Sequence, residues 1–249
     1  MIGGVFIGAG TVINIGAVVV GSGLGLLLGN RFPERTRTLV TQCLGLFTMV
    51  LGAGAIADGL SPALAQEAGE GAPMLIVLGA LLLGAITGSL IRLEDRLDTG
   101  AEWLRRKLAR GAEPGRFSEG LVTATLVFCV GPLSILGSIN DGLGAGAEQL
   151  VVKSVLDGFA AIAFASTLGV GVLFSVLPLA LYQGSLTVLG LGLGTFLSVG
   201  QVDALGATGG LILLGLGIRL AGIKKINVAD LLPGLVFAPL LVWLVSLWR

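Results

Sequence analysis

The sequence predicts an all-α, polytopic helical membrane protein with about eight transmembrane helices. The chain of 249 residues is 54% hydrophobic and only 12% charged, whereas soluble domains carry about 25% charged residues. Apolar runs of about 20 residues recur along the chain, which is the length that a helix needs to cross a bilayer core of about 30 Å. A membrane β-barrel would show alternating segments of about 10 residues instead, and the sequence has none.

Eight spans are predicted, and a chain of seven is the alternative if two neighbouring spans merge. They cover residues 2–28, 38–58, 73–92, 119–138, 150–174, 178–199, 204–221 and 230–248. The first apolar run is too long for the core of a signal peptide and has no basic segment before it. The fifth and sixth spans are predicted to meet at a nearly uncharged link around Leu177 and Pro178. Residues 1–249 are predicted to form a single integral membrane domain.

The Lys and Arg residues predict the orientation, because basic residues accumulate in cytoplasmic loops. The connections after the first, third and seventh spans hold 13 of the 15 basic residues. These are Arg31, Arg35, Arg37, Arg92, Arg96, Arg105, Arg106, Lys107, Arg110, Arg116, Arg219, Lys224 and Lys225. The other connections are acidic or neutral. The alternation predicts a multi-pass membrane protein with both termini outside and the basic connections in the cytoplasm.

Residues 93–117 are predicted to form a cytoplasmic amphipathic connection. Apolar residues recur every three or four positions there, which makes one apolar stripe on a helix. The stripe comprises Leu93, Leu97, Ala101, Leu104 and Leu108. Since basic residues and Trp103 flank it, the helix is predicted to lie in the membrane interface against anionic lipid. The alternative is a soluble helical hairpin that packs on the protein.

Small residues follow each other at four-residue spacing in two of the spans. They are Ala17, Gly21, Gly25 and Gly29 in the first span, and Ala80, Gly84 and Gly88 in the third. Such stripes let helix backbones approach closely in lipid, so they predict helix packing within the chain or, alternatively, a homo-oligomer. The two stripes align at a shift of 63 residues, which indicates a duplicated helix unit.

Two opposite charges in the fifth span mark the first part of the candidate site. Lys153 and Asp157 are four residues apart and therefore neighbours on one helix face. Asp157 lies roughly 10 Å inside the predicted start of the span. A carboxylate in the membrane interior costs about 2.5–3.5 kcal/mol, so it faces protein or a water-filled cavity. A structural ion pair and an ion or solute ligand are both consistent with this pattern.

The end of the fourth span supplies the second part of the candidate site. Asn140 and Asp141 follow Gly131 and Pro132, and a proline inside a helix removes a backbone hydrogen bond and kinks the helix. Broken helices that line a cavity are where transporters place ion sites. With the further polar residue Asn14, the predicted pathway comprises Asn14, Asn140, Asp141, Lys153 and Asp157.

Several classes of function are disfavoured by residue usage. The chain has no histidine, and its two cysteines lack metal-site spacing. No catalytic residue, metal ligand or cofactor is predicted. An intramembrane enzyme would need an acid and a base, and the two membrane aspartates are the remaining candidates for them. The formal net charge of zero gives no indication of nucleic-acid binding.

Three segments resemble a known family. They are "FCVGPLSILGSINDG", "KSVLDGFAAIAFASTLG" and "GLGIRLAGIKK". They are similar to the corresponding stretches of the YdfK/YqgA-like bacterial membrane proteins, a domain of unknown function, and the resemblance covers nearly the whole chain. It implies a polytopic inner-membrane protein, in which Asn140, Lys153 and Asp157 match the family pattern.

A transporter or channel for a small ion or solute is the first functional expectation. Its polar site would lie between the end of the fourth span and the start of the fifth. A non-transporting accessory or scaffolding membrane protein is the alternative, in which the glycine stripes and the basic connection serve assembly. The expected partners are the lipid bilayer, a small ion or solute, and a second copy of the chain.

Overall fold

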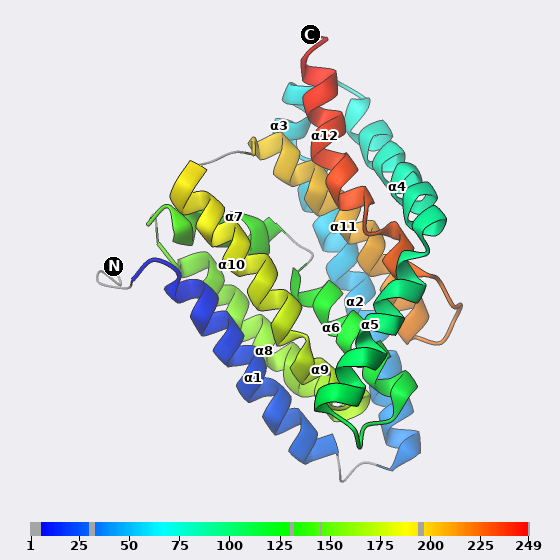
Figure 1. The fold of residues 1–249 in the computed structure, drawn as a ribbon. Helices are drawn as coiled ribbons and strands as arrows, with labels where there is room; N and C mark the ends of the chain where they lie inside the picture. Colours follow the sequence, from blue (N-terminus) through cyan, green and yellow to red (C-terminus); the bar gives the residue numbers. More distant parts are fainter. Residues whose placement is uncertain (1–5, 30–32, 130–131, 145, 194–196, 249) are drawn as a thin grey trace. The chain divides into compact units, whose positions relative to one another are not determined.

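The computed structural model describes residues 6–29, 33–129, 132–144, 146–193 and 197–248 (Figure 1). These residues form helices and no strand, which confirms the all-α class. The helices are α1 (Ala9–Gly29), α2 (Glu34–Gly59), α3 (Pro62–Ala68), α4 (Ala72–Ile91), α5 (Leu93–Leu108), α6 (Pro114–Cys129), α7 (Pro132–Gly142), α8 (Glu148–Leu168), α9 (Gly171–Phe174), α10 (Val176–Leu193), α11 (Val199–Leu220), the 3-10 helix η1 (Val228–Leu231) and α12 (Gly234–Ser246).

Seven helical segments in the described part of the chain are long and apolar enough to cross a membrane. They are Ala9–Gly29, Glu34–Gly59, Ala72–Ile91, Glu148–Leu168, Gly171–Gly192, Val199–Leu220 and Val228–Ser246. An eighth is the pair α6 and α7, which passes as one span with a bend of 64°. Large apolar side chains are exposed on these helices, for example Leu90, Leu181 and Phe159. Lipid contact explains this exposure, since water-soluble surfaces seldom expose so many large apolar groups.

The fifth and sixth spans are separate, and the link between them differs from the predicted one. The chain leaves α8 at Gly169, which adopts a φ of 79°, a left-handed conformation that glycine tolerates best. Pro178 instead lies in the first turn of α10, where its missing N–H removes no helical hydrogen bond. The predicted break at Gly131 lies outside the described residues, and Pro132 is the first residue of α7.

The contacts divide the chain into two compact units. Unit 1 comprises Met1–Leu44, Gly100–Cys129 and Leu133–Phe196, and unit 2 comprises Gly45–Thr99, Val130–Pro132 and Leu197–Arg249. The principal helices of unit 1 are α1, α6, α7, α8 and α10, whereas unit 2 contains α3, α4, α11, η1 and α12. The candidate site belongs to unit 1.

The glycine stripe of α1 packs on α8 within unit 1. Its contacts, in order along both helices, are Gly21 with Gly158, Gly25 with Ile162 and Gly29 with Ser166. A Cβ atom at any of the three stripe positions would overlap a carbonyl oxygen of α8. The packing interpretation is therefore confirmed, and α1 and α8 run parallel. A homo-oligomer stays a prediction, because this face of α1 is occupied within the chain.

Unit 2 uses the same type of contact between antiparallel helices. Along α2, the contacts with α11 are Gly45 with Gly217, Gly52 with Gly210 and Gly59 with Asp203. Along α4, Gly84 meets Gly234 at the start of α12 and Gly88 meets Asp230 of η1. The stripe of α4 thus serves packing as that of α1 does, but its partner runs in the opposite direction.

The helix directions agree with eight membrane crossings. In an alternating chain of eight spans, α1 and α8 are the first and fifth crossings and run parallel. The helices α2 and α11 are the second and seventh crossings, and α4 and α12 are the third and eighth. An even and an odd crossing run antiparallel, so both pairs are expected to be antiparallel. All three relations hold in the structure. If the bent pair of α6 and α7 did not cross the membrane, the expected relative direction of all three helix pairs would be reversed. The observed directions therefore favour α6 and α7 as one broken span.

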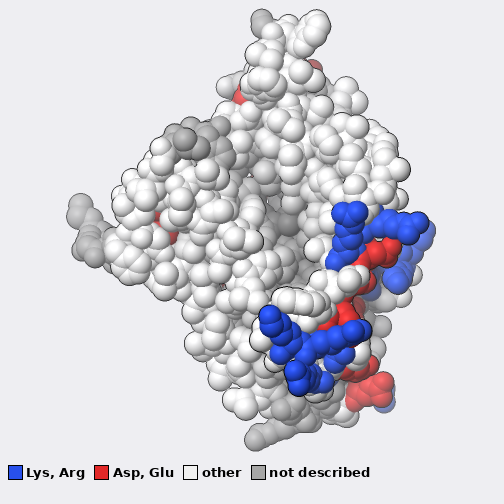
Figure 2. All heavy atoms as spheres, in the orientation of Figure 1, with Lys and Arg blue, Asp and Glu red and all other residues white. Residues whose placement is uncertain are grey.

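The predicted amphipathic connection contains the helix α5. Of its apolar stripe, Ala101 is buried, whereas Leu97 and Leu108 are exposed, as is the neighbouring Trp103. Lys and Arg gather around α5 on a face that is otherwise nearly uncharged (Figure 2). The exposed leucines and basic residues are compatible with an interfacial helix, and its contact with lipid stays a prediction.

One acidic residue moderates the charge of α5. Glu102 accepts hydrogen bonds from Arg105 Nε at 2.7 Å and from Arg106 Nε at 2.9 Å. These hydrogen bonds, first that from Arg105, lower the pKa of Glu102 from its ordinary value of 4.5 to about 2. The carboxylate therefore stays charged at neutral pH and partly neutralises the two arginines beside it.

Candidate functional site

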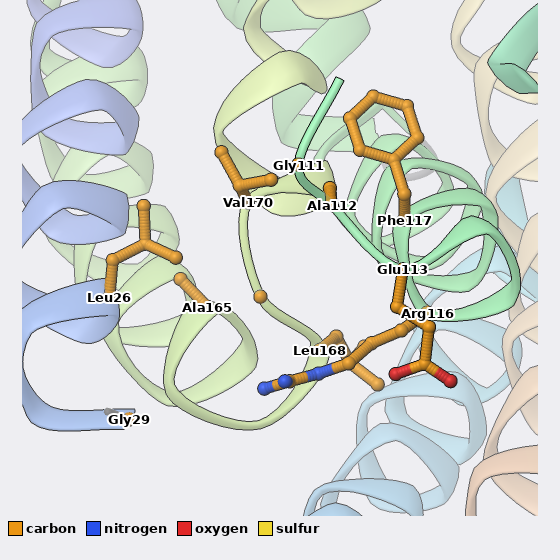
Figure 3. A pocket seen from close by; sticks show the side chains of 11 residues that line it. Leu26, Gly29, Gly111, Ala112, Glu113, Arg116, Phe117, Ala165, Leu168 and Val170 are labelled. Atoms are coloured by element: carbon orange, nitrogen blue, oxygen red, sulfur yellow. The ribbon is translucent and has the colours of Figure 1, made fainter. Parts of the chain in front are cut away.

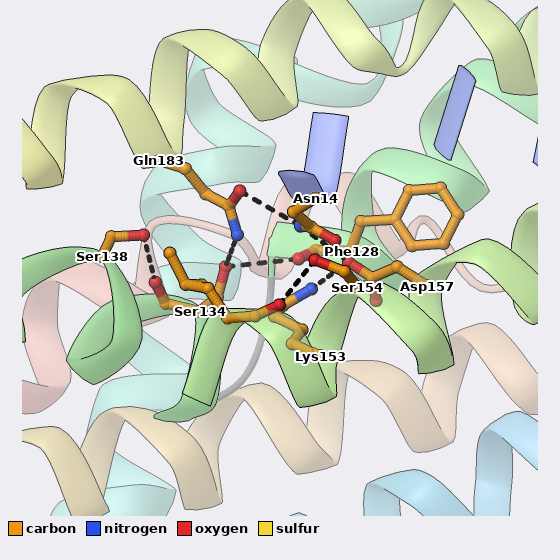
Figure 4. A network of polar contacts seen from close by, with 9 residues as sticks. Asn14, Phe128, Ser134, Ser138, Lys153, Ser154, Asp157 and Gln183 are labelled. Carbon is orange, nitrogen blue, oxygen red and sulfur yellow. Dashed lines mark hydrogen bonds and ion pairs between the residues drawn. The ribbon is translucent and has the colours of Figure 1, made fainter. Parts of the chain in front are cut away.

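A chain of buried polar side chains connects five helices of unit 1 (Figure 4). We call it the α8 polar network, and its members are Asn14 of α1, Ser134 of α7, Lys153 and Asp157 of α8, and Gln183 of α10, with the carbonyl of Phe128 in α6. Asn14, Ser134 and Gln183 are fully buried, and Lys153 and Asp157 are each 6% exposed. The network lies where α6 ends and α7 begins, beside the 64° bend.

Asp157 lies at one end of the network. Its Oδ2 atom accepts a hydrogen bond from Asn14 Nδ2 at 3.0 Å and forms an ion pair with Lys153 Nζ. The other Nδ2 hydrogen of Asn14 is donated to Gln183 Oε1 at 3.1 Å. Gln183 Nε2 donates to Ser134 Oγ at 3.1 Å, and that hydroxyl donates to Phe128 O at 3.3 Å.

The two ends of the network determine the direction of every hydrogen bond in it. A carbonyl oxygen only accepts, so the Ser134 hydroxyl donates to Phe128 and must accept from Gln183. The oxygen of Gln183 then faces the amide nitrogen of Asn14, which also donates to the Asp157 carboxyl group. The orientation of both amide groups therefore follows from the chemistry of their partners.

One acceptor in this network has no partner. Asn14 Oδ1 is buried and makes no hydrogen bond in the described part of the chain. An unpaired buried acceptor costs about 1–3 kcal/mol, so its presence in a folded protein calls for an explanation. The orientation that satisfies Asp157 and Gln183 leaves this oxygen free to accept.

Asp141, near the end of α7 in unit 1, caps the start of α1. Its two carboxylate oxygens accept the backbone N–H of Gly8 at 3.2 Å and of Thr11 at 3.0 Å. A carboxylate at a helix N-terminus satisfies free N–H groups and complements the helix dipole. The hydroxyls of Thr11 and Thr187 bond to each other at 3.0 Å beside it. Asp141 thus ties α7 to α1.

Asn140 lies apart from these groups. Consecutive residues on a helix differ by about 100° in direction, because a turn takes 3.6 residues. Asn140 is half-buried and donates to Gln149 Oε1 at 3.0 Å, whereas Asp141 is buried. The structure brings together Asn14, Lys153 and Asp157 of the five predicted residues, with Asp141 as a helix cap nearby.

We predict unequal effects of alanine at these two neighbours. Asp141→Ala should destabilise the protein by about 1–2 kcal/mol, because two N–H groups at the start of α1 lose their acceptor. Asn140→Ala is the matched control and should cost only about 0.5 kcal/mol, because it removes one hydrogen bond, that to Gln149. Thermal unfolding of both variants in detergent tests this. Equal shifts would contradict the capping role of Asp141.

Unit 2 holds a second buried ion pair with a different character. Glu94 pairs with Arg219 through Oε1 and accepts the Ala229 N–H at 2.9 Å through Oε2. The backbone N–H of Glu94 in turn donates to Asp230 Oδ1 at 2.9 Å. Both oxygens of Glu94 are therefore used, and the cluster joins the start of α5 to η1 and α11. We interpret this pair as structural, in contrast to the network with its unpaired oxygen.

A pocket of about 330 Å³ lies at the other end of α1 and α8 in unit 1 (Figure 3). Leu26, Ala165 and Phe117 contribute apolar walls, and Glu113 and Arg116 contribute charges. Arg116 Nε donates to Thr167 O at 2.9 Å. Ala165 is eight residues from Asp157, or roughly 12 Å along the helix. The pocket therefore reaches α8 two turns away from the polar network.

The comparison with known families covers both units. The sequence profile of the family described as "Protein of unknown function (DUF554)" matches residues 9–243. The chain belongs to this family. No solved structure matches the chain.

Two curated relatives extend over nearly the whole length of this DUF554 chain. The "Uncharacterized membrane protein YdfK" of Bacillus subtilis (strain 168) is 28% identical over 236 residues, which are 95% of this chain and 96% of the relative. The "Uncharacterized protein YqgA" of Escherichia coli (strain K12) is 31% identical over 232 residues, with 92% and 94% covered. The resemblance read from the sequence is confirmed, and the range matched by the family, residues 9–243, includes the positions of the network.

Sequence reasoning on this DUF554 chain did not find every member of the network. Ser134 and Gln183 were not among the predicted pathway residues, although Gln183 is an uncharged polar residue in an otherwise apolar run. This placement of a polar residue among apolar ones is the one signal for Gln183 in the sequence. Ser134 has no such signal, because serine in a membrane helix commonly bonds to its own backbone. Here Ser138 does so, donating to Ser134 O at 2.7 Å.

Proposed function

We propose that this protein transports a small monovalent cation across the bacterial cytoplasmic membrane, with Asp157 as the charged ligand. The observation that carries the proposal is the α8 polar network, in which a buried carboxylate and an unpaired amide oxygen meet between helices beside a broken span. Transporters place ion sites where broken helices line the protein interior. The proposal assigns no catalysed reaction.

The chemistry of the network favours a cation over an anion. Asp157 supplies a carboxylate. Asn14, whose side-chain nitrogen donates to Asp157, supplies a free acceptor, its Oδ1 atom. Oxygen ligands of this type suit hard cations. An anion would instead meet the Asp157 carboxylate in a low-dielectric interior, where like charges repel strongly.

The charge balance favours a monovalent cation. The position beside Asp157 already holds one positive charge, the ammonium group of Lys153. One carboxylate balances one unit of positive charge, whereas a divalent ion would leave an excess charge inside the membrane. Such an excess is costly at membrane depth. Na⁺ and K⁺ are therefore the appropriate probes.

Stability alone is a weak reason for this arrangement. An apolar pair of similar volume can replace a buried ion pair at little cost, and such a replacement is sometimes stabilising. The ion pair in unit 2 has all carboxylate oxygens bonded, whereas the network in unit 1 leaves Asn14 Oδ1 unsatisfied. A purely structural role does not require this unpaired acceptor.

The pocket in unit 1 is the described cavity on α8, two helical turns away from the site. It opens beside the end of α1 and reaches Ala165, and the predicted orientation assigns this end of α1 to the cytoplasm. The network itself is closed, since Asp157 is 6% exposed. The proposed transport therefore requires that the helices around Asp157 move apart for a cation to pass.

The test is flux into proteoliposomes with ²²Na⁺ and, as a tracer for K⁺, ⁸⁶Rb⁺. The parent protein should take up at least one of them, and Asp157→Asn, compared at equal amounts of folded protein, should lose the uptake because it lacks the charge. Asp230→Asn is the matched control, since it removes a carboxylate outside the network but keeps its acceptor oxygen. Full uptake by Asp157→Asn would rule out the assigned site.

An accessory or scaffolding protein is the second candidate. The exposed leucines and basic residues of α5 favour it, because they provide a surface for lipid or for a partner. In that case neither cation would be taken up by the parent protein, and the Lys153 and Asp157 pair would be structural.

A further inference from the structure

Backbone contacts join the helices around the α8 polar network in two pairs. The first pair is α1 with α8, where the glycine stripe of α1 lies against carbonyl oxygens of α8. The second pair is α7 with α10, where a Cβ atom at Gly142 would overlap the carbonyl oxygen of Thr187, and one at Gly190 would overlap that of Ile139. Backbones this close have no flexible side chain between them that could adjust. Each pair is therefore expected to move as one body.

Side chains, in contrast, make the hydrogen bonds that join α1 to α10 in the described residues. Thr11 and Thr187 bond through their hydroxyls at 3.0 Å, and Asn14 Nδ2 donates to Gln183 Oε1 at 3.1 Å. We call this boundary between α1 and α10, at these four residues, the seam. Hydrogen bonds of side chains can be exchanged for bonds to water while the helices stay intact. The seam is thus where the two pairs can separate.

The helix α7 is attached to the first pair by the same kind of bond. The Asp141 carboxylate accepts N–H groups at the start of α1, and Asn140 Nδ2 donates to Gln149 Oε1 of α8 at 3.0 Å. A side chain takes part in each of these bonds, so water can replace them too. The bonds between α7 and the first pair therefore permit α7 and α10 to move together.

The seam leads from the start of α1 to Asp157. Thr11 is the third residue of α1, and Asn14, three residues further along, donates to Asp157 Oδ2 at 3.0 Å. With their partners Thr187 and Gln183 on α10, they form two layers of polar side chains between the start of α1 and this carboxylate. The start of α1 is the end that the basic residues predict to face outside. Hydroxyl and amide oxygens in this position can replace water around a cation.

The seam is closed in the structure. Thr11 and Thr187 are each 6% exposed, and Asn14 and Gln183 are fully buried (Figure 4 shows the inner layer). The fully buried Leu150 of α8 fills the space beside the seam, where it contacts one glycine of α1 and one of α7. A cation that comes from the start of α1 therefore meets the threonine pair first, and the bond between the two hydroxyls must break before it can pass.

We infer that a cation reaches Asp157 from the start of α1 along the seam, and that Thr11 and Thr187 form its gate. The inference rests on the proposed function, because it assigns a route to the cation site at Asp157. The gate opens when α7 and α10 move as one body away from α1 and α8, which exchanges the bond between the hydroxyls for bonds to water. Movement of rigid helix groups around a fixed site is how transporters alternate access. The hydroxyl oxygens then contact the passing cation.

The experiment closes the gate with a disulfide. Thr11→Cys is combined with Thr187→Cys in a protein whose Cys43 and Cys129 are replaced by alanine. The thiols take the place of hydroxyls that are 3.0 Å apart, so they are close enough to join. Oxidation should abolish uptake of ²²Na⁺ or ⁸⁶Rb⁺ into proteoliposomes, because the two helix pairs can no longer separate, and dithiothreitol should restore it. Loss of free thiols confirms that the disulfide forms.

A disulfide within the first pair is the matched control. Ala17→Cys with Gly158→Cys joins α1 to α8 in the same cysteine-free protein. A Cβ atom at Gly158 would lie 3.6 Å from that of Ala17, which suits a disulfide. Oxidation should leave uptake unchanged, because this pair moves as one body. Uptake that continues through the oxidised gate variant, or equal loss with both disulfides, would overturn the inference.

Two further variants test the hydroxyls without a disulfide. Thr11→Val with Thr187→Val keeps the size of both side chains but removes both oxygens. Uptake per amount of folded protein should fall at least about tenfold, because each oxygen contact that the passing cation loses raises the barrier. Thr11→Ser with Thr187→Ser keeps the oxygens and should retain most of the uptake. Parent-like uptake by the valine variant would contradict the gate.

The same flux measurements distinguish failure of the inference from failure of the proposed function. No uptake by the parent protein, or full uptake by Asp157→Asn, would overturn the proposed function itself. Uptake that requires Asp157 but continues in the oxidised gate variant and in the valine variant would leave the cation site in place and contradict only the route along the seam.

Discussion

Leucine in place of Gly25 is expected to prevent folding, whereas leucine in place of Gly23 is expected to be tolerated. Gly25 lies against the backbone of α8, where a Cβ atom would overlap the carbonyl of Ile162, while nothing lies within 4 Å of a Cβ atom at Gly23. The two glycines share one helix, so helix propensity and hydrophobicity change equally. The difference between the variants therefore measures the contact between α1 and α8.

The cost at Gly25 should reach about 3 kcal/mol or more, the upper end of the range for overpacking, because the obstacle is backbone and not a flexible side chain. Gly25→Ala adds the Cβ atom alone and should be less damaging. Size-exclusion chromatography in detergent measures the folded yield. Equal yields for leucine at both positions would show that α1 does not approach α8 in this way.

Lys153→Met alone is expected to be the most destabilising change within the polar network when choline is the only cation. It leaves Asp157 as an unpaired charge, and breaking a buried ion pair on one side costs about 3–5 kcal/mol. Adding Asp157→Leu removes the remaining charge and should restore most of the stability, since an apolar pair can replace a buried ion pair. The proposed site predicts in addition that Na⁺ or K⁺ rescues the single variant but not the double one.

Thermal unfolding in choline, sodium and potassium chloride at equal ionic strength measures all three effects. A purely structural ion pair predicts the same restoration by Asp157→Leu, but no rescue of Lys153→Met by any of the salts. The double variant should be folded and inactive in flux. Uptake by the double variant would show that the charges serve stability alone.

Local spacing was sufficient to predict part of the site. Lys153 and Asp157 are four residues apart on one helix, and this spacing alone places their side chains together. The packing face of α1 was predictable for the same reason, because small residues four positions apart lie on one face of a helix. The segregation of basic residues predicted that successive spans alternate in direction across the membrane, and the helix directions agree with this.

Partners far apart in the sequence were not predictable in this way. Gln183 lies 169 residues from Asn14 and 49 residues from Ser134, and no local pattern encodes which helices adjoin. The sequence predicts the link between the fifth and sixth spans around Leu177 and Pro178, whereas α8 ends at Gly169. Asn140 and Asp141 are adjacent in sequence, but the helix turns them in different directions.

The most direct test of the central claim is the thermal stability of the parent protein and of Asp157→Asn as Na⁺ or K⁺ replaces choline. A ligand that binds the folded state raises its stability with increasing concentration, by about 2.7 kcal/mol at 100 times its Kd. We predict that the melting temperature of the parent rises with one of these cations, whereas that of Asp157→Asn stays constant. An equal rise in both proteins, or no rise in the parent, would contradict a cation site at Asp157.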